Sequence, residues 1–312
     1  MNIYPLTLLI QYICLALGII FTKNVVMQAS VFFATGTRSL FAFIVLAGMC
    51  RKAKTSLLDM FRDIPLYLIS GALFRMFLPW ALIGWSLQHV TAVKYALLNS
   101  FAPFITAVLC WVILSEKITK IKILGLLIGS CGIIPILMVK SAQEINFMSQ
   151  LYSLSLPEIG LLLGIASMCY GWVEMKKLLT LRPEISEIGL RAYDVLLSGI
   201  AALVVAILFE SKWLYTESIS LFIGTQLAVV LFTTIFGNNL YAWHVRRLSP
   251  VLLSLASLSR PFFVALFIWL WYGEPVGLEL YCSTGLILIG SIIFYKEEIS
   301  GKLQTLKNNS QN

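Results

Sequence analysis

Charged residues are scarce in this sequence. Of the 312 residues only 12% are charged and 59% are apolar or aromatic, whereas soluble domains carry about 25% charged residues. This composition excludes a single soluble core. Ten spans of about 20 residues would use about 200 positions and leave only short loops and tails. The sequence therefore predicts a polytopic protein whose main partner is the lipid bilayer.

Residues for metal, redox and acid–base chemistry are also few. There are two histidines, His89 and His244, and six cysteines that lie in or beside apolar runs without a CxxC spacing. No HExxH, HxxxxD or DDxxD-like pattern and no glycine-rich phosphate loop occurs, so we expect no metal, no cofactor and no enzyme. The 23 Lys and Arg residues are scattered along the chain, mostly in loops, and do not cluster with interleaved aromatics, which argues against a nucleic-acid partner.

Long apolar runs alternate with short polar or basic breaks. We expect an all-α protein, because runs this long suit membrane helices and are too long for barrel strands. The ten expected helices cover residues 4–22, 31–49, 65–86, 91–114, 119–139, 157–179, 187–208, 220–243, 249–272 and 276–295.

Basic residues fall mostly on one side of this expected topology. Alternate loops collect fifteen Lys and Arg on one side and four on the other, and the remaining four are arginines inside helices. Because basic loops stay in the cytoplasm, we expect both termini there, in a plasma membrane that is most simply a bacterial inner membrane.

The two halves of the chain resemble each other. A shift of 158 residues lays 89–116 on 247–274 with seven identities, including Pro103 on Pro261 and Trp111 on Trp269. A shift of 153 aligns Gly18 with Gly171 and Arg38 with Arg191 near the start of each half. Five helices per copy is an odd number, so we predict inverted five-helix repeats at 1–145 and 146–298, followed by a polar cytoplasmic tail at 299–312. Inverted repeats place a substrate site between the halves and permit alternating access.

Particular motifs of the sequence resemble a known family. Leu248-Ser249-Pro250, Arg260-Pro261-Phe262 and Tyr272-Gly273-Glu274-Pro275 are similar to the second repeat of EamA-type carriers of the drug/metabolite transporter superfamily. Ala102-Pro103-Phe104 and Ser115-Glu116-Lys117 form the matching pattern in the first half, although Leu17 replaces the tryptophan usual before the first glycine. The resemblance implies secondary transport, of substrates ranging from amino acids and S-adenosylmethionine to sugar phosphates and nucleotide sugars.

Arginines inside helices are the strongest site candidates, because a charge at the centre of a membrane helix costs about 2.5 kcal/mol or more. Arg75 and Arg260 lie mid-run without a carboxylate nearby in sequence. Either they face a cavity and bind an anionic substrate group, or they are structural and pair across helices. Arg260 precedes Pro261, which lacks the backbone donor of a regular helix.

Other charged residues suit gating or ion pairing. Arg191 and Asp194 stand three apart on one helical face, which favours an ion pair between them. Arg38 is either an outer-gate cation or an interfacial anchor. Lys23 and Glu174, toward opposite membrane edges, either contact a substrate or gate, or lie at the interface. If all are ionised, the four arginines and Asp194 leave the helix interiors at a net charge of +3, which disfavours cationic drugs.

Amide and aromatic side chains complete the expected site. An amide inside a membrane needs a hydrogen-bond partner, from another helix or from a ligand. An indole or phenol stacks on a flat ring of the substrate or belongs to the interfacial belt. The candidates are Gln11, Asn99, Asn238, Asn239, Trp80, Trp85 and Tyr95.

These features predict a transporter for a small metabolite with a carboxylate or phosphate, most simply an amino-acid-like zwitterion such as an amino acid or S-adenosylmethionine. A phosphorylated metabolite or a nucleotide sugar stays open, as does a passive channel. Proton coupling needs a titrating group in the membrane. Arg191 should keep Asp194 charged and Lys176 and Lys177 should do the same for Glu174, so we expect an exchanger or facilitator.

The topology is tested by labelling single cysteines placed at Lys212 and Lys302 with a membrane-impermeant reagent. We expect the two positions to react from opposite faces of the membrane, because an even number of helices separates Lys302 from the N-terminus and an odd number separates Lys212. Labelling of both from one side would contradict the inverted arrangement.

Overall fold

The computed structural model describes residues 4–116, 119–131, 155–216 and 218–272, with a few isolated positions between 282 and 293. The tenth expected helix, the end of the fifth, the boundary at 145/146 and the tail at 299–312 lie outside these ranges, apart from those isolated positions. Within the described ranges the chain is all helical, with one isolated β-bridge between Ala29 and Leu214.

The first half follows the expected order of helices. Its elements are α1 (Tyr4–Gln28), α2 (Val31–Lys52), α3 (Leu57–Asp63), α4 (Pro65–Gly71), the π-helical segment η1 (Ala72–Phe77), α5 (Leu78–His89), α6 (Ala92–Leu98), the 3₁₀ segment η2 (Asn99–Phe101), α7 (Ala102–Leu114) and α8 (Lys120–Cys131). Elements α4, η1 and α5 join into one continuous span, Pro65–His89.

The described second half repeats this order as far as the equivalent of α7, without a counterpart of α3. It consists of α11 (Leu156–Leu181), α12 (Glu187–Phe209), α13 (Ile219–Val229), the π-helical segment η3 (Val230–Asn238), α14 (Asn239–Arg247), α15 (Pro250–Ala256), the 3₁₀ segment η4 (Ser257–Ser259) and α16 (Arg260–Tyr272). Elements α13 to α14 form the span Ile219–Arg247.

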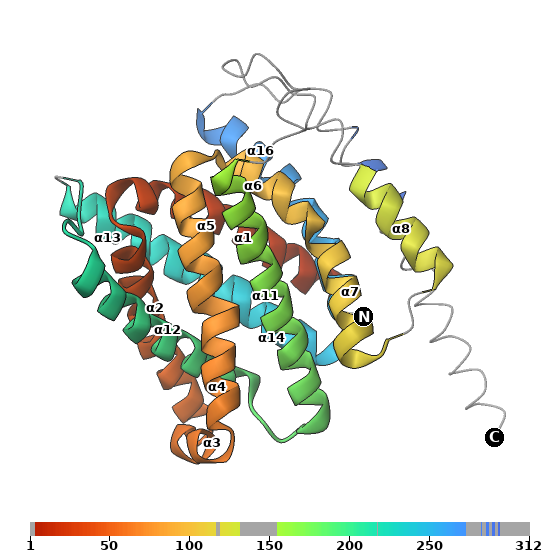
Figure 1. Cartoon of the computed structure of the whole chain (residues 1–312), viewed down its shortest axis with the longest axis horizontal. Helices are drawn as coiled ribbons and strands as arrows, with labels where there is room; N and C mark the ends of the chain where they lie inside the picture. The colour runs from red at the N-terminus through yellow and green to blue at the C-terminus, as the bar shows by residue number, and fades with distance from the viewer. Residues whose placement is uncertain are drawn as a thin grey trace.

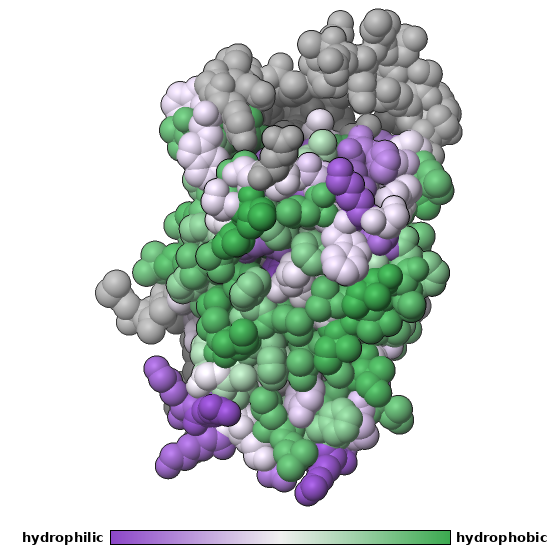
Figure 2. All heavy atoms as spheres, turned by 90° about the vertical axis from the view of Figure 1, so that its left-hand side faces the viewer, coloured by the Kyte–Doolittle hydropathy of each residue, from purple (hydrophilic) through white to green (hydrophobic). Residues whose placement is uncertain are grey.

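Seven of the described helices are long and apolar enough to cross a membrane, and a shorter apolar helix covers Asn99–Leu114. Their outward faces carry large apolar side chains, such as Ile44 on α2 and Ile207 on α12, which are 68% and 64% exposed. Figure 2 shows apolar surface around the middle of the molecule and hydrophilic residues toward its ends. The protein is an integral membrane protein with several apolar helices.

Irregular helix segments recur at the spacing found in the sequence. Both π-helical segments begin 158 residues apart, at Ala72 and Val230, and both 3₁₀ segments do so, at Asn99 and Ser257. Pro103 and Pro261 explain the 3₁₀ segments, because a proline cannot donate to the carbonyl four residues earlier. That carbonyl accepts instead from the residue three ahead, Ala102 for Asn99 and Arg260 for Ser257. The duplication therefore extends to the backbone hydrogen bonds.

The two halves interlock rather than lie side by side. Helix α11 of the second half packs on α5 and η1 of the first, while α1 of the first half packs on α13 and η3 of the second, and α2 pairs with α12 (Figure 1). The crossings correspond: a Cβ at Gly171 would lie 2.6 Å from Cγ of Arg75, and one at Gly18 would lie 1.9 Å from Oγ1 of Thr233. Each crossing thus requires a glycine on the first helix of a half.

One carboxylate ties the halves together at one end of the bundle. Glu210, at the end of α12, accepts hydrogen bonds from Ser30 Oγ at 2.5 Å and from the backbone N–H groups of Phe32 and Phe33 at 3.1 and 3.2 Å. It therefore caps α2, where a negative charge also complements the helix dipole.

Gly171→Ala tests the α11–η1 crossing. The added methyl would also lie 2.9 Å from the backbone nitrogen of Arg75, and overpacking of this kind costs about 1–3 kcal/mol. We expect a lower thermal unfolding midpoint in detergent. Gly224→Ala is the matched control, because a Cβ there meets nothing within 4 Å. Equal midpoints for the two variants would contradict this packing.

Candidate substrate cavity

A cavity lies between the two halves. Its empty volume, including the space at its opening, is about 600 Å³. Its lining is mixed: apolar Leu15, Ile19, Ala102, Met168 and Cys169; aromatic Trp80, Tyr95, Trp172 and Tyr241; polar Asn99, Thr106, Thr233, Asn238, Ser254 and Ser257; and the cation Arg260.

Equivalent positions of the two halves line this cavity together. Five pairs of lining residues are related by the shifts of 153 and 158: Leu15 with Met168, Ile19 with Trp172, Trp80 with Asn238, Asn99 with Ser257, and Ala102 with Arg260. The cavity is therefore centred between the duplicated units, while its chemistry is asymmetric. Arg260 is the one charged side chain of the described lining, and its equivalent in the first half is Ala102.

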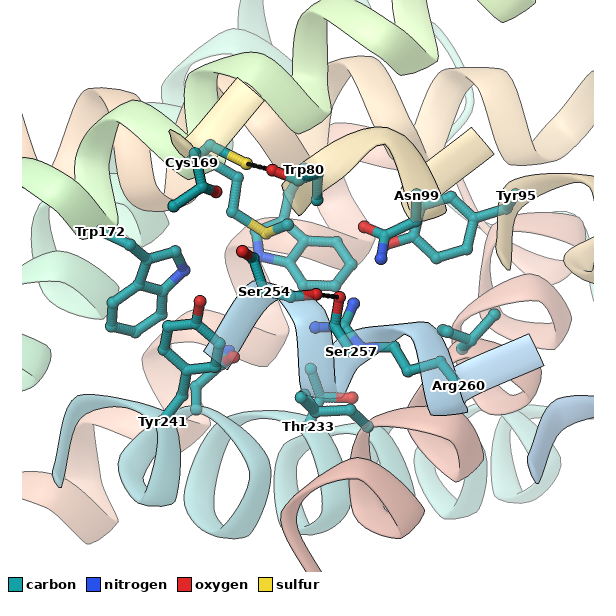
Figure 3. A pocket seen from close by; sticks show the side chains of 16 residues that line it. Trp80, Tyr95, Asn99, Cys169, Trp172, Thr233, Tyr241, Ser254, Ser257 and Arg260 are labelled. Atoms are coloured by element: carbon teal, nitrogen blue, oxygen red, sulfur yellow. Dashed lines mark hydrogen bonds between the residues drawn. The ribbon is translucent and has the colours of Figure 1, made fainter. Parts of the chain in front are cut away.

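The 3₁₀ segments place the polar residues of the cavity. Asn99 begins η2, Ser257 begins η4, and Arg260 follows η4 directly. In Figure 3, Asn99, Tyr95 and Arg260 lie on one side of the cavity, and Trp172 and Tyr241 lie on the other. The rings of Trp172 and Tyr241 have centroids 4.5 Å apart. The site thus has a polar side with the cation and an aromatic side opposite.

Arg260 is a buried cation without a protein anion. Its side chain is 7% exposed, and its Cζ lies 5.5 Å from the ring centroid of Tyr12. In the described ranges no carboxylate or hydrogen-bond acceptor contacts its guanidinium, and its Nε is buried without a partner. Asn99 Oδ1 is likewise buried without a hydrogen bond. Unsatisfied buried groups of this kind are costly, and a carboxylate or phosphate of a ligand would satisfy the arginine.

Arg38 lies close to the cavity but does not line it. Its guanidinium carbon lies 4.3 Å from the ring centroid of Trp80, and its Nη2 is buried without a hydrogen-bond partner. Of the described carboxylates, none pairs with Arg38. Trp80 is itself a lining residue, so an uncompensated charge lies against one side chain of the cavity wall.

Arg75 and Arg191 share a buried carboxylate. Arg75 donates from Nε and Nη2 to the two oxygens of Asp194, both at 2.9 Å, and Arg191 donates to Asp194 Oδ2 at 3.0 Å. All three side chains are fully buried. Arg75 also donates to the carbonyl of Gly171 at 2.8 Å. This triad joins η1, α11 and α12, and therefore both halves.

The sequence matches the EamA-like transporter family twice, over residues 2–138 and 156–296. The chain belongs to the EamA-like transporter family. The two matches coincide with the duplicated halves seen in the fold. Membership makes this protein a transporter, as the motifs of the sequence had suggested, and not an enzyme.

Relatives of this EamA-like transporter have a known substrate class. A transporter of Chlamydia muridarum (strain MoPn / Nigg), described as an S-adenosylmethionine/S-adenosylhomocysteine transporter, is 29% identical over 280 residues, which are 89% of this chain and 86% of the relative. A protein of the same description from Chlamydia trachomatis serovar L2 is 28% identical over 89% of this chain and 84% of its own. A solved crystal structure shares the fold, with a TM-score of 0.68 and 16% identity over 92% and 95% of the two chains.

The cavity contains some of the residues that sequence reasoning proposed. Trp80, Tyr95, Asn99, Asn238 and Arg260 line it, whereas four other candidates do not. Gln11 Oε1 lies 2.6 Å from Nδ1 of His244, Trp85 packs on His89 with ring centroids 5.2 Å apart, and Asn239 has a buried amide that bonds to no described residue.

Arg75 is the fourth candidate that does not line the cavity. Of the two roles expected for it, it has the structural one, because it pairs with a carboxylate on another helix. The expected ion pair of Arg191 with Asp194 is present, but Asp194 binds Arg75 as well. Lys23 donates to the carbonyl of Val90 at 3.0 Å and to that of Leu87. Glu174 accepts from Ser70 Oγ at 2.8 and 2.9 Å.

Sequence reasoning missed Trp172, Tyr241, Ser254 and Ser257. The register of the repeat could have found one of them, because Ser257 is equivalent to the candidate Asn99. Trp172, Tyr241 and Ser254 are equivalent to Ile19, Ile83 and Ala96, which carry no polar signal.

Asp194→Asn tests the buried triad. Removing the charge leaves two buried arginines without their counter-ion, which costs about 3–5 kcal/mol when a buried pair is broken. We expect a marked fall in the thermal unfolding midpoint of the purified transporter. Asp63→Asn is the control, because Asp63 forms a half-exposed pair with Arg182 at 2.6 Å and such pairs contribute less than about 1 kcal/mol. Similar effects of both changes would contradict the role of the triad.

Proposed function

We propose that this EamA-like transporter carries a small zwitterionic metabolite of the S-adenosylmethionine and S-adenosylhomocysteine class. The observation that carries the proposal is the cavity between the halves, in which Arg260 is a buried cation without a described counter-ion. The relatives with 28–29% identity support the choice of substrate class.

The carboxylate of the substrate binds Arg260 in this proposal. A guanidinium presents a planar pair of donors that matches a carboxylate or a phosphate with two parallel hydrogen bonds. Arg75 is not assigned to the substrate, because Asp194 and the Gly171 carbonyl already accept from it. The ammonium group has the hydroxyls and the amide oxygen of Ser254, Ser257 and Asn99 nearby as acceptors.

The adenine ring belongs to the aromatic part of the cavity. Trp172 and Tyr241, with Tyr95 on the other side, offer ring faces, and stacking of a base on such a face contributes about 1–3 kcal/mol. Asn238 presents an amide to the same space. A phosphorylated metabolite or a nucleotide sugar is the second candidate, because the uncompensated charge of Arg38 behind Trp80 would also favour a substrate with more negative charge.

Transport proceeds by alternating access in this proposal. Ten helices as two inverted five-helix repeats, with both termini in the cytoplasm, let the halves rock about the cavity between them. Repetition of the π-helical and 3₁₀ segments at a spacing of 158 residues supports the duplication on which this mechanism depends.

Exchange or facilitated diffusion is the proposed mode. Asp194 is the most buried carboxylate of the described residues, and both Arg75 and Arg191 donate to it, so its oxygens already serve a structural contact between the halves. A substrate whose carboxylate compensates Arg260 removes the charge that would otherwise oppose reorientation, which suits movement in the loaded state.

Arg260→Lys tests substrate binding in proteoliposomes. The lysine keeps the charge but loses the planar donor pair, and hydrogen bonds between charged groups contribute about 1.5–3 kcal/mol. We expect S-adenosylmethionine uptake at subsaturating concentration to fall roughly tenfold or more. Arg247→Lys is the matched control, because Arg247 lies over Trp243 outside the cavity lining. Unchanged uptake by the Arg260 variant would contradict the assignment.

The same vesicles separate the modes of transport. Uptake should be saturable and should rise when the vesicles are preloaded with unlabelled substrate. A passive channel would show neither property. Strong uptake into empty vesicles driven by an imposed pH gradient, and lost in Asp194→Asn, would replace exchange by proton coupling at Asp194.

A further inference from the structure

The aromatic walls of the cavity differ from those of a site that binds cations. Aromatic sites for organic cations leave the ring faces free for the ligand, whose charge the rings attract. Here each of the two tryptophans of the lining is already in cation–π contact with an arginine. The Cζ of Arg38 lies 4.3 Å from the ring centroid of Trp80, and the Cζ of Arg191 lies 5.4 Å from that of Trp172. Both guanidinium groups are buried.

The two arginines differ in how far their charge is compensated. Arg191 pairs with Asp194 at 3.0 Å, whereas Arg38 has no carboxylate partner among the described residues. The described lining contains no carboxylate either, and its one charged side chain is Arg260. The field at the face of Trp80 is therefore positive, and the strongest source of that field behind the ring is Arg38.

We infer that Arg38, acting through Trp80, makes the carrier bind the thioether S-adenosylhomocysteine more tightly than the sulfonium S-adenosylmethionine; this inference rests on the proposed function. The two molecules share the adenosine and the amino-acid end and differ by one methyl group and one positive charge on sulfur. A neutral ligand at the Trp80 face meets no net repulsion from Arg38. A sulfonium there is repelled by a like charge that is buried and so poorly screened.

The size of the effect follows from Coulomb's law. A sulfonium that contacts the free face of the indole would lie roughly 8 Å from the guanidinium, and an effective dielectric constant of about 20 then gives a roughly thirtyfold weakening. The additional methyl group of the sulfonium makes contacts that offset part of this loss of affinity. We therefore expect a preference of at least roughly fivefold for the thioether.

The experiment is equilibrium binding of radiolabelled S-adenosylhomocysteine to the purified full-length protein, with displacement by either unlabelled molecule. The ratio of the two dissociation constants is measured in the wild type, in Arg38→Gln and in Arg247→Gln. Arg247 is the matched control, because it also lies 4.3 Å from a tryptophan centroid, but that of Trp243, outside the lining. If Arg38→Gln does not accumulate, Arg38→Met keeps an unbranched chain over Trp80 and replaces it.

The inference is supported if the wild type prefers the thioether, the Arg38 variant loses at least two thirds of that preference and the Arg247 variant keeps it. It is overturned if the wild type binds the sulfonium equally well or better, or if the preference is the same in the Arg38 variant. Binding of neither molecule would reject the proposed substrate class, and the inference with it.

Discussion

The constraint on which this structure depends is the cost of an arginine inside a bilayer. Four arginines lie within the apolar helices, and the protein stabilises them in two ways. Arg75 and Arg191 share Asp194, with bonds of 2.9–3.0 Å. Arg38 and Arg260 instead lie over aromatic rings, 4.3 and 5.5 Å from the centroids. The first pair fixes the helices of one half against those of the other, and the second pair leaves positive charge at the cavity.

Duplication sets the place of the cavity, and departures from duplication set its chemistry. The equivalent positions 75 and 233 hold an arginine that binds Asp194 and a threonine that lines the cavity. At the equivalent positions 102 and 260 the arginine is in the second half, and both Ala102 and Arg260 line the cavity. Each half therefore contributes one arginine from a pair of equivalent positions, one in the buried triad and one in the cavity lining. A cavity with the same residue at both equivalent positions would not distinguish the two ends of a zwitterion in this way.

Periodic features of the fold could be predicted from the sequence. The order of helices and their approximate limits followed from the lengths of the apolar runs, and the repeat followed from a register in which Pro103 and Pro261 coincide. Backbone detail within a run could not be predicted in full. The π-helical segments at 72–77 and 230–238 lie inside longer apolar runs, and no proline or other residue in them predicts a wide turn.

The sequence by itself determined that the chain spans a membrane, that its halves are copies and that a few arginines need partners, because hydropathy, register and buried charge depend on residue type and order alone. Only the tertiary structure decided which arginine meets which partner. Asp194 is three residues from Arg191 but more than a hundred from Arg75, and the contact with Arg75 exists because α12 packs on η1. The choice between an ion pair and a ligand site depends on distances across helices, which no local pattern encodes.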